Sequence, residues 1–243
     1  MNYSFLQCGE GALTVHLGDG IDPAVNRRVT ALQGAIGSAG LRGITDLIPA
    51  YADLTVCYDC TVISAKALQR QLRRLLDSLS VAGQDRRRVF RLPVCYGGEY
   101  GPDLDFVCHH SGLSAQEVIA LHSQPDYLIY MLGFLPGFAY LGGLDPRLHT
   151  PRLDSPRTCI PAGSVGIGGA QTGVYPLASP GGWQLLGRTP VSVFDRQRQE
   201  PILYRAGDLV HFVPISPAEY EEIARAVAAG TYTVQVEEVP VCD

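Results

Sequence analysis

Lysine is almost absent from this chain, and its scarcity excludes several chemistries. Of the 19 Lys and Arg residues, only Lys66 is a lysine. A phosphate-binding P-loop has a lysine directly after its second glycine, whereas the segment GGAQTGV has valine there. Lys66 itself lies in the first turn of a predicted helix. Schiff-base catalysis, which needs a lysine in a desolvated pocket, is therefore not expected.

An excess of positive charge is also missing. The formal net charge is -5 and the sequence pI is about 5.7, which argues against a nucleic-acid or anionic-membrane partner. The opening residues, MNYSFLQCGEGALTVHL, lack the ordered basic, apolar and small-residue regions of a secretory signal. Residues 127–144 carry no charge, but Pro136 and several glycines disfavour a lipid-facing helix there. We therefore expect a cytoplasmic protein.

Metal and nucleophile motifs are absent or incomplete. The seven cysteines are scattered, and the C-x-x-C pair Cys57 and Cys60 follows a predicted strand without a second pair. The histidines show no zinc-ligand spacing, so no metal site is predicted. Ser164, in AGSVG, resembles a nucleophile elbow, but the glycine-rich continuation cannot supply the helix that an elbow requires. GIGGAQ misses the dinucleotide-binding spacing.

The first 85 residues are predicted to form an α+β domain. NYSFLQCG and ALTVHLG predict a hairpin, DPAVNRRVTALQGAIGSAG predicts a capped helix, and DLTVCYD predicts a further strand. A second helix is predicted from Ser64. Its leucines form an apolar stripe opposite three arginines: Leu68, Leu72, Leu75, Leu76 and Leu79 against Arg70, Arg73 and Arg74. The polar segment GQDRRR, residues 83–88, is the predicted linker.

Residues 89–243 are predicted to form a second, mainly β domain. Two helices are predicted by capping boxes, one from Ser114 with Glu117 and one from Ser216 with Glu219. Between them, 12 of the chain's 27 glycines fall within residues 133–187, so the backbone there needs turns and close approaches. Short strands joined by such turns favour a barrel or sandwich over alternating βα units.

Two arginines are the predicted anion binders. Arg188 and Arg157 are catalytic candidates because a guanidinium can grip a carboxylate or phosphate with two parallel hydrogen bonds. The alternative is that they are structural arginines paired with Asp154 or Asp195. His122 is the third catalytic candidate; its alternative role is a favourable interaction with the carbonyl end of the helix that begins after Ser114.

Six further residues are candidates for substrate binding. An amide and a hydroxyl between glycines can be presented to a ligand, and the aromatics can wall a pocket or fill the barrel core. The two aromatics in PGFAYLGG face a ligand or form an intersubunit contact. These candidates are Gln171, Thr172, Tyr175, Trp183, Phe138 and Tyr140.

Long segments of the chain resemble the allophanate hydrolase subunit 1-like family. The resemblance runs from GEGALTVHLG through LPVCYGGEYGPDL, GFLPGFAYL and PAGSVGIGGAQTGVYP to EPILYRAGDLVHFVPI. It implies a ferredoxin-like N-terminal domain and a cyclophilin-like β-barrel domain. Despite the family name, the glycine-serine-rich loop and Lys-Ser-Ser triad expected of an amidase are not present.

The resemblance also implies a function that depends on other proteins. The implied activity is the ATP-dependent opening of 5-oxoproline to L-glutamate, in complex with two further 5-oxoprolinase subunits. One of them, the C subunit, is of the biotin-dependent carboxyltransferase-like kind, and the other is a separate A subunit. ATP would be a co-substrate, and whether Mg²⁺ accompanies it stays open. The alternatives are inhibition of a sensor histidine kinase and a carboxyltransferase-like part in a urea carboxylase-type system.

Overall fold

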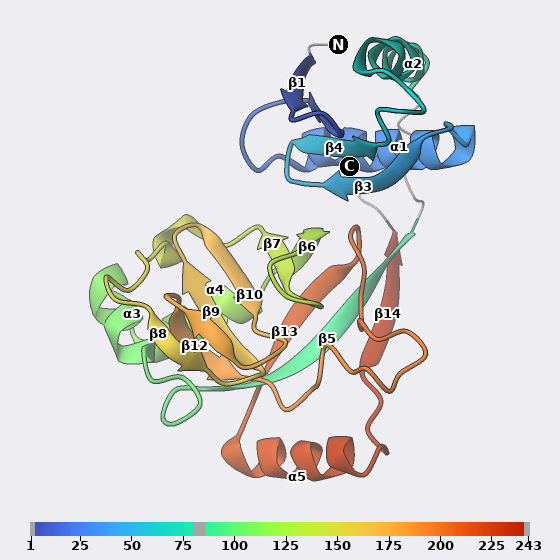
Figure 1. Cartoon of the computed structure of the whole chain (residues 1–243). Coiled ribbons are helices and arrows are strands. Elements are labelled where there is room, and N and C mark those ends of the chain that lie inside the picture. The colour runs from blue at the N-terminus through green and yellow to red at the C-terminus, as the bar shows by residue number, and fades with distance from the viewer. Residues whose placement is uncertain (1–2, 80–85, 241–243) are drawn as a thin grey trace. The chain divides into compact units, whose positions relative to one another are not determined.

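The computed structural model describes residues 3–79 and 86–240. Contacts divide the chain into two compact units, Met1–Asp85 and Arg86–Asp243, and the elements of each are labelled in Figure 1. Residues 83–85 of the predicted linker lie outside the described residues. The other three linker residues were predicted wrongly, because Arg86, Arg87 and Arg88 already belong to the first strand of the second unit.

The first unit is a four-stranded antiparallel sheet with two helices. Its strands lie in the order β1-β2-β4-β3, the ferredoxin-like order with the last strand moved to the front of the chain. The elements are β1 (Ser4–Cys8), β2 (Ala12–His16), α1 (Pro23–Ala39), β3 (Ile44–Pro49), β4 (Asp53–Tyr58) and α2 (Ala65–Asp77).

One face of this sheet carries the core of the first unit. Along β4, Leu54, Val56 and Tyr58 are buried while the residues between them are partly exposed, as the two-residue strand period requires. The predicted leucine stripe of α2 is confirmed: Leu68, Leu72 and Leu76 are fully or almost fully buried in the same core. The arginines on the opposite face of α2 are exposed.

The second unit is built around a β-barrel with helices among its connections. Its strands are β5 (Arg86–Tyr96), β6 (Asp126–Leu132), β7 (Ala139–Gly142), β8 (Arg157–Ile160), β9 (Ser164–Gly168), β10 (Gln171–Val174), β11 (Ser179–Gly181), β12 (Gln184–Arg188), β13 (Leu209–Ile215) and β14 (Gln235–Pro240). The helices are α3 (Leu104–Ser111), α4 (Ala115–Ser123), the 3-10 turn η1 (Pro146–Leu148) and α5 (Pro217–Ala228).

Seven strands close the barrel, in the order β12-β9-β10-β7-β6-β13-β5, with β5 returning to β12. All neighbours are antiparallel except β13 and β5, so the barrel is mixed. The length of β5 explains the closure: Cys95 and Tyr96 pair with β12, while residues 86–91 pair with β14. The predicted barrel domain after an α+β domain is confirmed.

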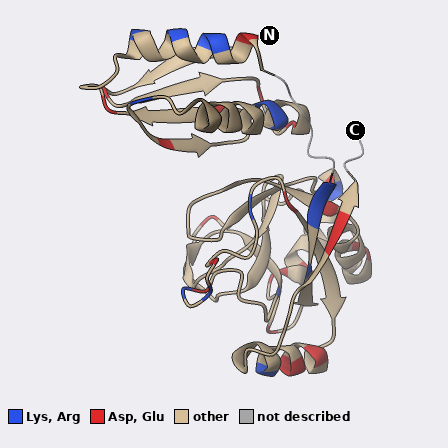
Figure 2. Ribbon diagram, turned by 90° about the vertical axis from the view of Figure 1, so that its right-hand side faces the viewer, with Lys and Arg blue, Asp and Glu red and all other residues tan. Residues whose placement is uncertain are grey.

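The C-terminal strand β14 is held to β5 by charge as well as by backbone hydrogen bonds. Figure 2 shows the two strands side by side, β5 with blue arginines and β14 with red glutamates. Arg91 donates to both carboxylate oxygens of Glu237, at 2.8 and 2.9 Å. Such bidentate pairs are the stronger class of ion pair.

Both predicted capping boxes are present. The Ser114 hydroxyl accepts from the backbone N–H of Glu117, whose carboxylate accepts in return from the Ser114 backbone, and Ser216 with Glu219 repeats the arrangement. The first of these boxes fixes the start of α4, which carries Val118 and His122 into the barrel. α5 has no fully buried residue and lies on the outside of the barrel (Figure 1).

Candidate functional site

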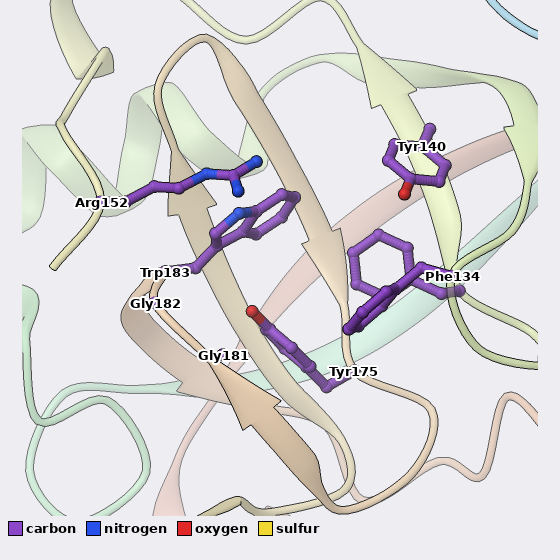
Figure 3. A pocket seen from close by; sticks show the side chains of 8 residues that line it. Phe134, Tyr140, Arg152, Tyr175, Gly181, Gly182 and Trp183 are labelled. Carbon is purple, nitrogen blue, oxygen red and sulfur yellow. The ribbon is translucent and has the colours of Figure 1, made fainter. Parts of the chain in front are cut away.

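An aromatic pocket lies against the outer wall of the barrel, beside the two-stranded sheet β8-β11. Its volume is about 120 Å³. We call it the aromatic pocket; it is lined by Phe134, Phe138, Tyr140, Arg152, Tyr175, Gly181, Gly182 and Trp183 (Figure 3). Four of the six predicted substrate-binding residues, all of them aromatic, are thus brought together here from β7 and from the β6-β7, β10-β11 and β11-β12 connections.

Glycine in the barrel wall makes room for the tryptophan. Along β9, Val165 and Ile167 belong to the barrel core, so the residues that alternate with them face outward. Gly168 is one of these, and a Cβ at this position would collide with Nε1 of Trp183. The indole therefore lies flat against a strand that has no side chain at the contact. The glycine-rich composition of this segment is a packing requirement, not a phosphate loop.

The rings of the aromatic pocket form a separate small core. Phe138 lies edge-on to Tyr140, Tyr175 and Trp183, with ring centroids 5.2, 5.6 and 5.6 Å away. Edge-to-face pairs of this kind stabilise by more than the apolar area that they bury. Trp183 is only 4% exposed and Phe138 only 3%. The pocket is therefore a preformed, rigid hollow rather than a loose surface patch.

The pocket has polar groups at its edges. In Figure 3 the Tyr175 hydroxyl points toward Trp183 and the Arg152 guanidinium lies along the same indole. Burial raises the pKa of Tyr175, and the positive charges of Arg152 and Arg157 act against that rise. Tyr175 therefore stays a neutral hydroxyl, able to donate or accept a hydrogen bond at the edge of the hollow.

Phe134 stands at the mouth of the pocket in a strained conformation. Its φ is +63°, the only positive value among the non-glycine residues that the structure describes, and the residue is 64% exposed. Its ring meets Phe138 edge-on at 5.6 Å. A bulky residue in the left-handed region is uncommon, and such strain concentrates at functional sites. Sequence reasoning missed Phe134, although it belongs to the same GFLPGF segment as Phe138.

Arg157, a predicted catalytic residue, is a structural clamp in this fold. Its Nη2 donates to Asp103 at 2.7 Å and its Nη1 donates to the Trp183 carbonyl at 3.4 Å. The other Asp103 oxygen accepts from the Leu185 backbone N–H at 2.6 Å. The carboxylates considered from the sequence, Asp154 and Asp195, are not its partners in these contacts. Arg157 therefore positions the β11-β12 connection, which carries Trp183, and the start of β12.

Arg188, the other arginine singled out from the sequence, lies at the end of β12, whereas Trp183 directly precedes that strand. It does not line the aromatic pocket. Its Nε is buried without a hydrogen-bond partner among the described residues. Burial raises the pKa of Tyr220, and the charge and hydrogen bond of Arg188 oppose this. Tyr220 lines a second hollow, of about 190 Å³, with Gly163 and Thr189.

His122 and Thr172 lie inside the barrel, not at the pocket. The Thr172 hydroxyl donates to the Gly166 carbonyl at 3.0 Å, so it accepts from Nε2 of His122 at 2.7 Å. Nδ1 must then accept, and it does so from the Tyr96 hydroxyl at 2.8 Å. The imidazole stacks on Phe212, 4.8 Å between centroids. The predicted helix-end interaction is thus replaced by a closed internal network.

The remaining sequence candidates do not add chemistry to the pocket. Gln171 is half-buried at the start of β10 and does not line it. Ser164 is fully buried, with its hydroxyl unpaired within the described residues, and no helix follows it.

Among residues 3–79 and 86–240 no three His, Cys, Asp or Glu side chains are placed to hold a metal ion. Across the same ranges, no helix has the length and apolarity to cross a membrane.

Burial of His122 predicts a pH-dependent stability. Burial lowers its pKa from 6.5 to about 3. Below pH 6.5 the unfolded chain binds a proton at this imidazole and the folded chain does not, so acid favours unfolding. The stabilisation is complete above pH 6.5 and falls by about 1.4 kcal/mol per pH unit down to about pH 3, or roughly 2 kcal/mol at pH 5.

Urea unfolding at pH 7 and pH 5 checks this expectation. The free energy of unfolding should fall more steeply toward acid in the wild type than in His122→Asn, which is less stable at pH 7 but has no imidazole to titrate. Equal pH slopes in the two proteins would show that His122 is protonated in the folded state.

Comparison with known proteins identifies the family. Residues 3–204 match the sequence profile of the family described as carboxyltransferase domain, subdomain C and D. The chain belongs to this family. The matched range includes the whole aromatic pocket, so the pocket lies in the part of the chain that the carboxyltransferase-domain family shares.

Two relatives match this family member over nearly their whole length. The B subunit of 5-oxoprolinase from Bacillus subtilis (strain 168) is 43% identical over 230 residues, 90% of this chain and 96% of the relative. The protein of the same name from Escherichia coli O157:H7 is 45% identical over 207 residues, 85% of this chain and 93% of the relative. The family predicted from the sequence is thereby confirmed.

A solved structure supports the fold. The crystal structure of TTHA0988 is 40% identical to this chain, with a TM-score of 0.75 over 84% of it. This chain spans only 40% of that longer protein. The shared part therefore also occurs joined to a further polypeptide.

Proposed function

We propose that this chain is one component of an ATP-dependent 5-oxoprolinase, which opens 5-oxoproline to L-glutamate in the cytoplasm together with the A and C subunits. The observation that carries the proposal is the 43% identity to a 5-oxoprolinase B subunit, 96% of which the match covers. The function is proposed for the assembled complex, with the chain alone inactive.

The chemistry explains why ATP is needed. A lactam is a poor electrophile, and transfer of the γ-phosphoryl group to the lactam oxygen turns that oxygen into a good leaving group. One water then adds to the same carbon, and the C–N bond of the ring opens with a proton passing to the nitrogen, which leaves an acyl phosphate of glutamate. A second water hydrolyses this acyl phosphate and releases phosphate. The products are L-glutamate, ADP and phosphate. Phosphoryl transfer asks a protein mainly for positioning and for positive charge.

The aromatic pocket is our proposed binding site for the lactam. Its volume of about 120 Å³ is well below the roughly 300–1,000 Å³ of pockets that take drug-sized ligands. It suits a five-membered ring, and it is too small for a nucleotide. The aromatic faces exclude water from the ring, and the Tyr175 hydroxyl offers one hydrogen bond at the edge.

ATP must then bind outside this pocket. Arg188, beside the second hollow, stays our candidate for contacting an anion, because its buried Nε–H donates to no acceptor among the described residues. Any Mg²⁺ would be held mainly by the ATP phosphates and partner carboxylates, as is usual for this ion. We assign His122 and Thr172 a structural role in this proposal, and Arg157 a positioning role.

Reconstitution tests the proposed function. The chain is purified alone and with its candidate A and C subunits, and glutamate and phosphate release from 5-oxoproline and ATP are followed. We expect turnover only with all three proteins. Absence of turnover by the complete set overturns the proposal. Inhibition of a sensor kinase's autophosphorylation, or support of urea carboxylation, by the same preparation would then identify the alternative.

A further inference from the structure

Arg152 is a positive charge without a carboxylate partner. Among the described residues no Asp or Glu oxygen lies within ion-pair distance of it, and it makes no hydrogen bond. Arg157, five residues later, is paired with Asp103 at 2.7 Å, and the exposed Arg147, five residues earlier, is paired with Asp145 at 2.7 Å. Of these three arginines, only Arg152, at the aromatic pocket, has no carboxylate partner among the described residues.

The guanidinium of Arg152 is nevertheless held in place. Its Cζ lies 6.0 Å from the centre of the Trp183 ring, within the range of a cation–π contact. Figure 3 shows it extending along the indole toward the hollow rather than away from it. Its charge reaches the pocket interior, where it opposes the rise in the pKa of Tyr175.

The rest of the aromatic pocket carries no charge. Apart from Arg152, its lining consists of aromatic side chains and two glycines. A hollow with apolar ring faces and one cation at its edge fits a small flat ring that carries one carboxylate, whereas the Arg152 charge repels a cationic ligand, which the ring faces alone would attract. The strained Phe134 at the mouth independently marks the same hollow as a functional site.

From this geometry we infer that Arg152 is a specificity-determining residue that binds the carboxylate of a lactam acid while Trp183 and Phe138 hold the ring. This inference rests on the proposed function and adds to it: the chain selects lactams that carry a carboxylate over neutral lactams. The carboxylate stands on the carbon bonded to the ring nitrogen, so the guanidinium anchors the substrate on the side of that nitrogen opposite the carbonyl carbon.

Trp183 is the chain's only tryptophan and therefore a built-in probe of the pocket. The purified chain is titrated with 5-oxoproline and with 2-pyrrolidinone, the same ring without the carboxylate, while tryptophan emission is followed. We expect 5-oxoproline to bind at least about tenfold more tightly. In Arg152→Gln the two ligands should bind equally weakly, and Arg152→Lys should recover part of the preference. Arg147→Gln, which removes an exposed and already paired arginine, is the matched control.

Steady-state kinetics of the assembled complex give the second readout. Arg152→Gln should raise the KM for 5-oxoproline at least about tenfold and leave the KM for ATP unchanged. An unchanged KM for 5-oxoproline, or equal affinity of the wild-type chain for the two lactams, overturns the inference. If the wild-type complex turns over 5-oxoproline in that case, the proposed function stands and only the role of Arg152 fails; if the complex is inactive, the proposed function fails.

Discussion

Replacing Gly168 with alanine should displace the only tryptophan and destroy the aromatic pocket. The added Cβ would collide with Nε1 of Trp183, a rigid group wedged between β9 and the ring of Phe138. Overpacking of this kind costs about 1–3 kcal/mol. Tryptophan emission should shift to longer wavelengths as the indole leaves its dry site, and urea unfolding should show the lost stability.

The neighbouring Gly169→Ala variant is the matched control. Gly169 has φ +64° and open space around its missing Cβ, so alanine there incurs only the conformational cost of the left-handed region, about 1–2 kcal/mol. Its emission spectrum should match that of the wild type. If Gly168→Ala keeps the wild-type spectrum, the indole does not lie against β9 as described.

Removing the carboxylate of Asp103 should have the largest effect on stability. Asp103 is 9% exposed and accepts from both Arg157 and the Leu185 backbone. Asp103→Ala leaves a half-buried guanidinium without its anion and a buried N–H without its acceptor. We expect a loss of about 3 kcal/mol in the free energy of unfolding, together with looser packing of Trp183, whose carbonyl accepts from the same arginine.

Asp145→Ala is the comparison for Asp103→Ala. Asp145 also pairs with an arginine at 2.7 Å, but its partner Arg147 is exposed. Ion pairs in water contribute little, so its loss in urea unfolding should be far smaller. Equal losses in the two variants would mean that the Asp103 contacts do not hold β8 and β12 together.

Local signals predicted the helices well, because their causes are local. The Ser114 and Glu117 side chains satisfy each other's backbone groups within one turn, and the leucine stripe of α2 repeats within one helix. Neither feature depends on the rest of the fold. Elements without such signals were missed: α3 follows the N-cap residue Asp103, whose side chain caps no backbone N–H of the helix but bonds to residues more than 50 positions away.

The roles of the arginines could not be read from the sequence. Arg152 and Arg157 occur in one segment and differ only in that the fold brings Asp103 to the second of them. Alternation along β12 is also interrupted by a register shift between Leu185 and Gly187, so counting from Trp183 does not give the direction of Arg188. The ion-pair partners of these arginines and the register of β12 depend on residues far away in the chain, so neither could be predicted from a single sequence.

Substrate affinity of the assembled enzyme tests the central claim, that the aromatic pocket of this chain holds the lactam. Glutamate release is measured against 5-oxoproline and ATP concentration for complexes that contain the wild-type, Gly168→Ala or Gly169→Ala chain. We predict that Gly168→Ala raises the KM for 5-oxoproline by at least about tenfold, with the KM for ATP unchanged and Gly169→Ala close to wild type. A Gly168→Ala complex with the wild-type KM for 5-oxoproline would contradict the account.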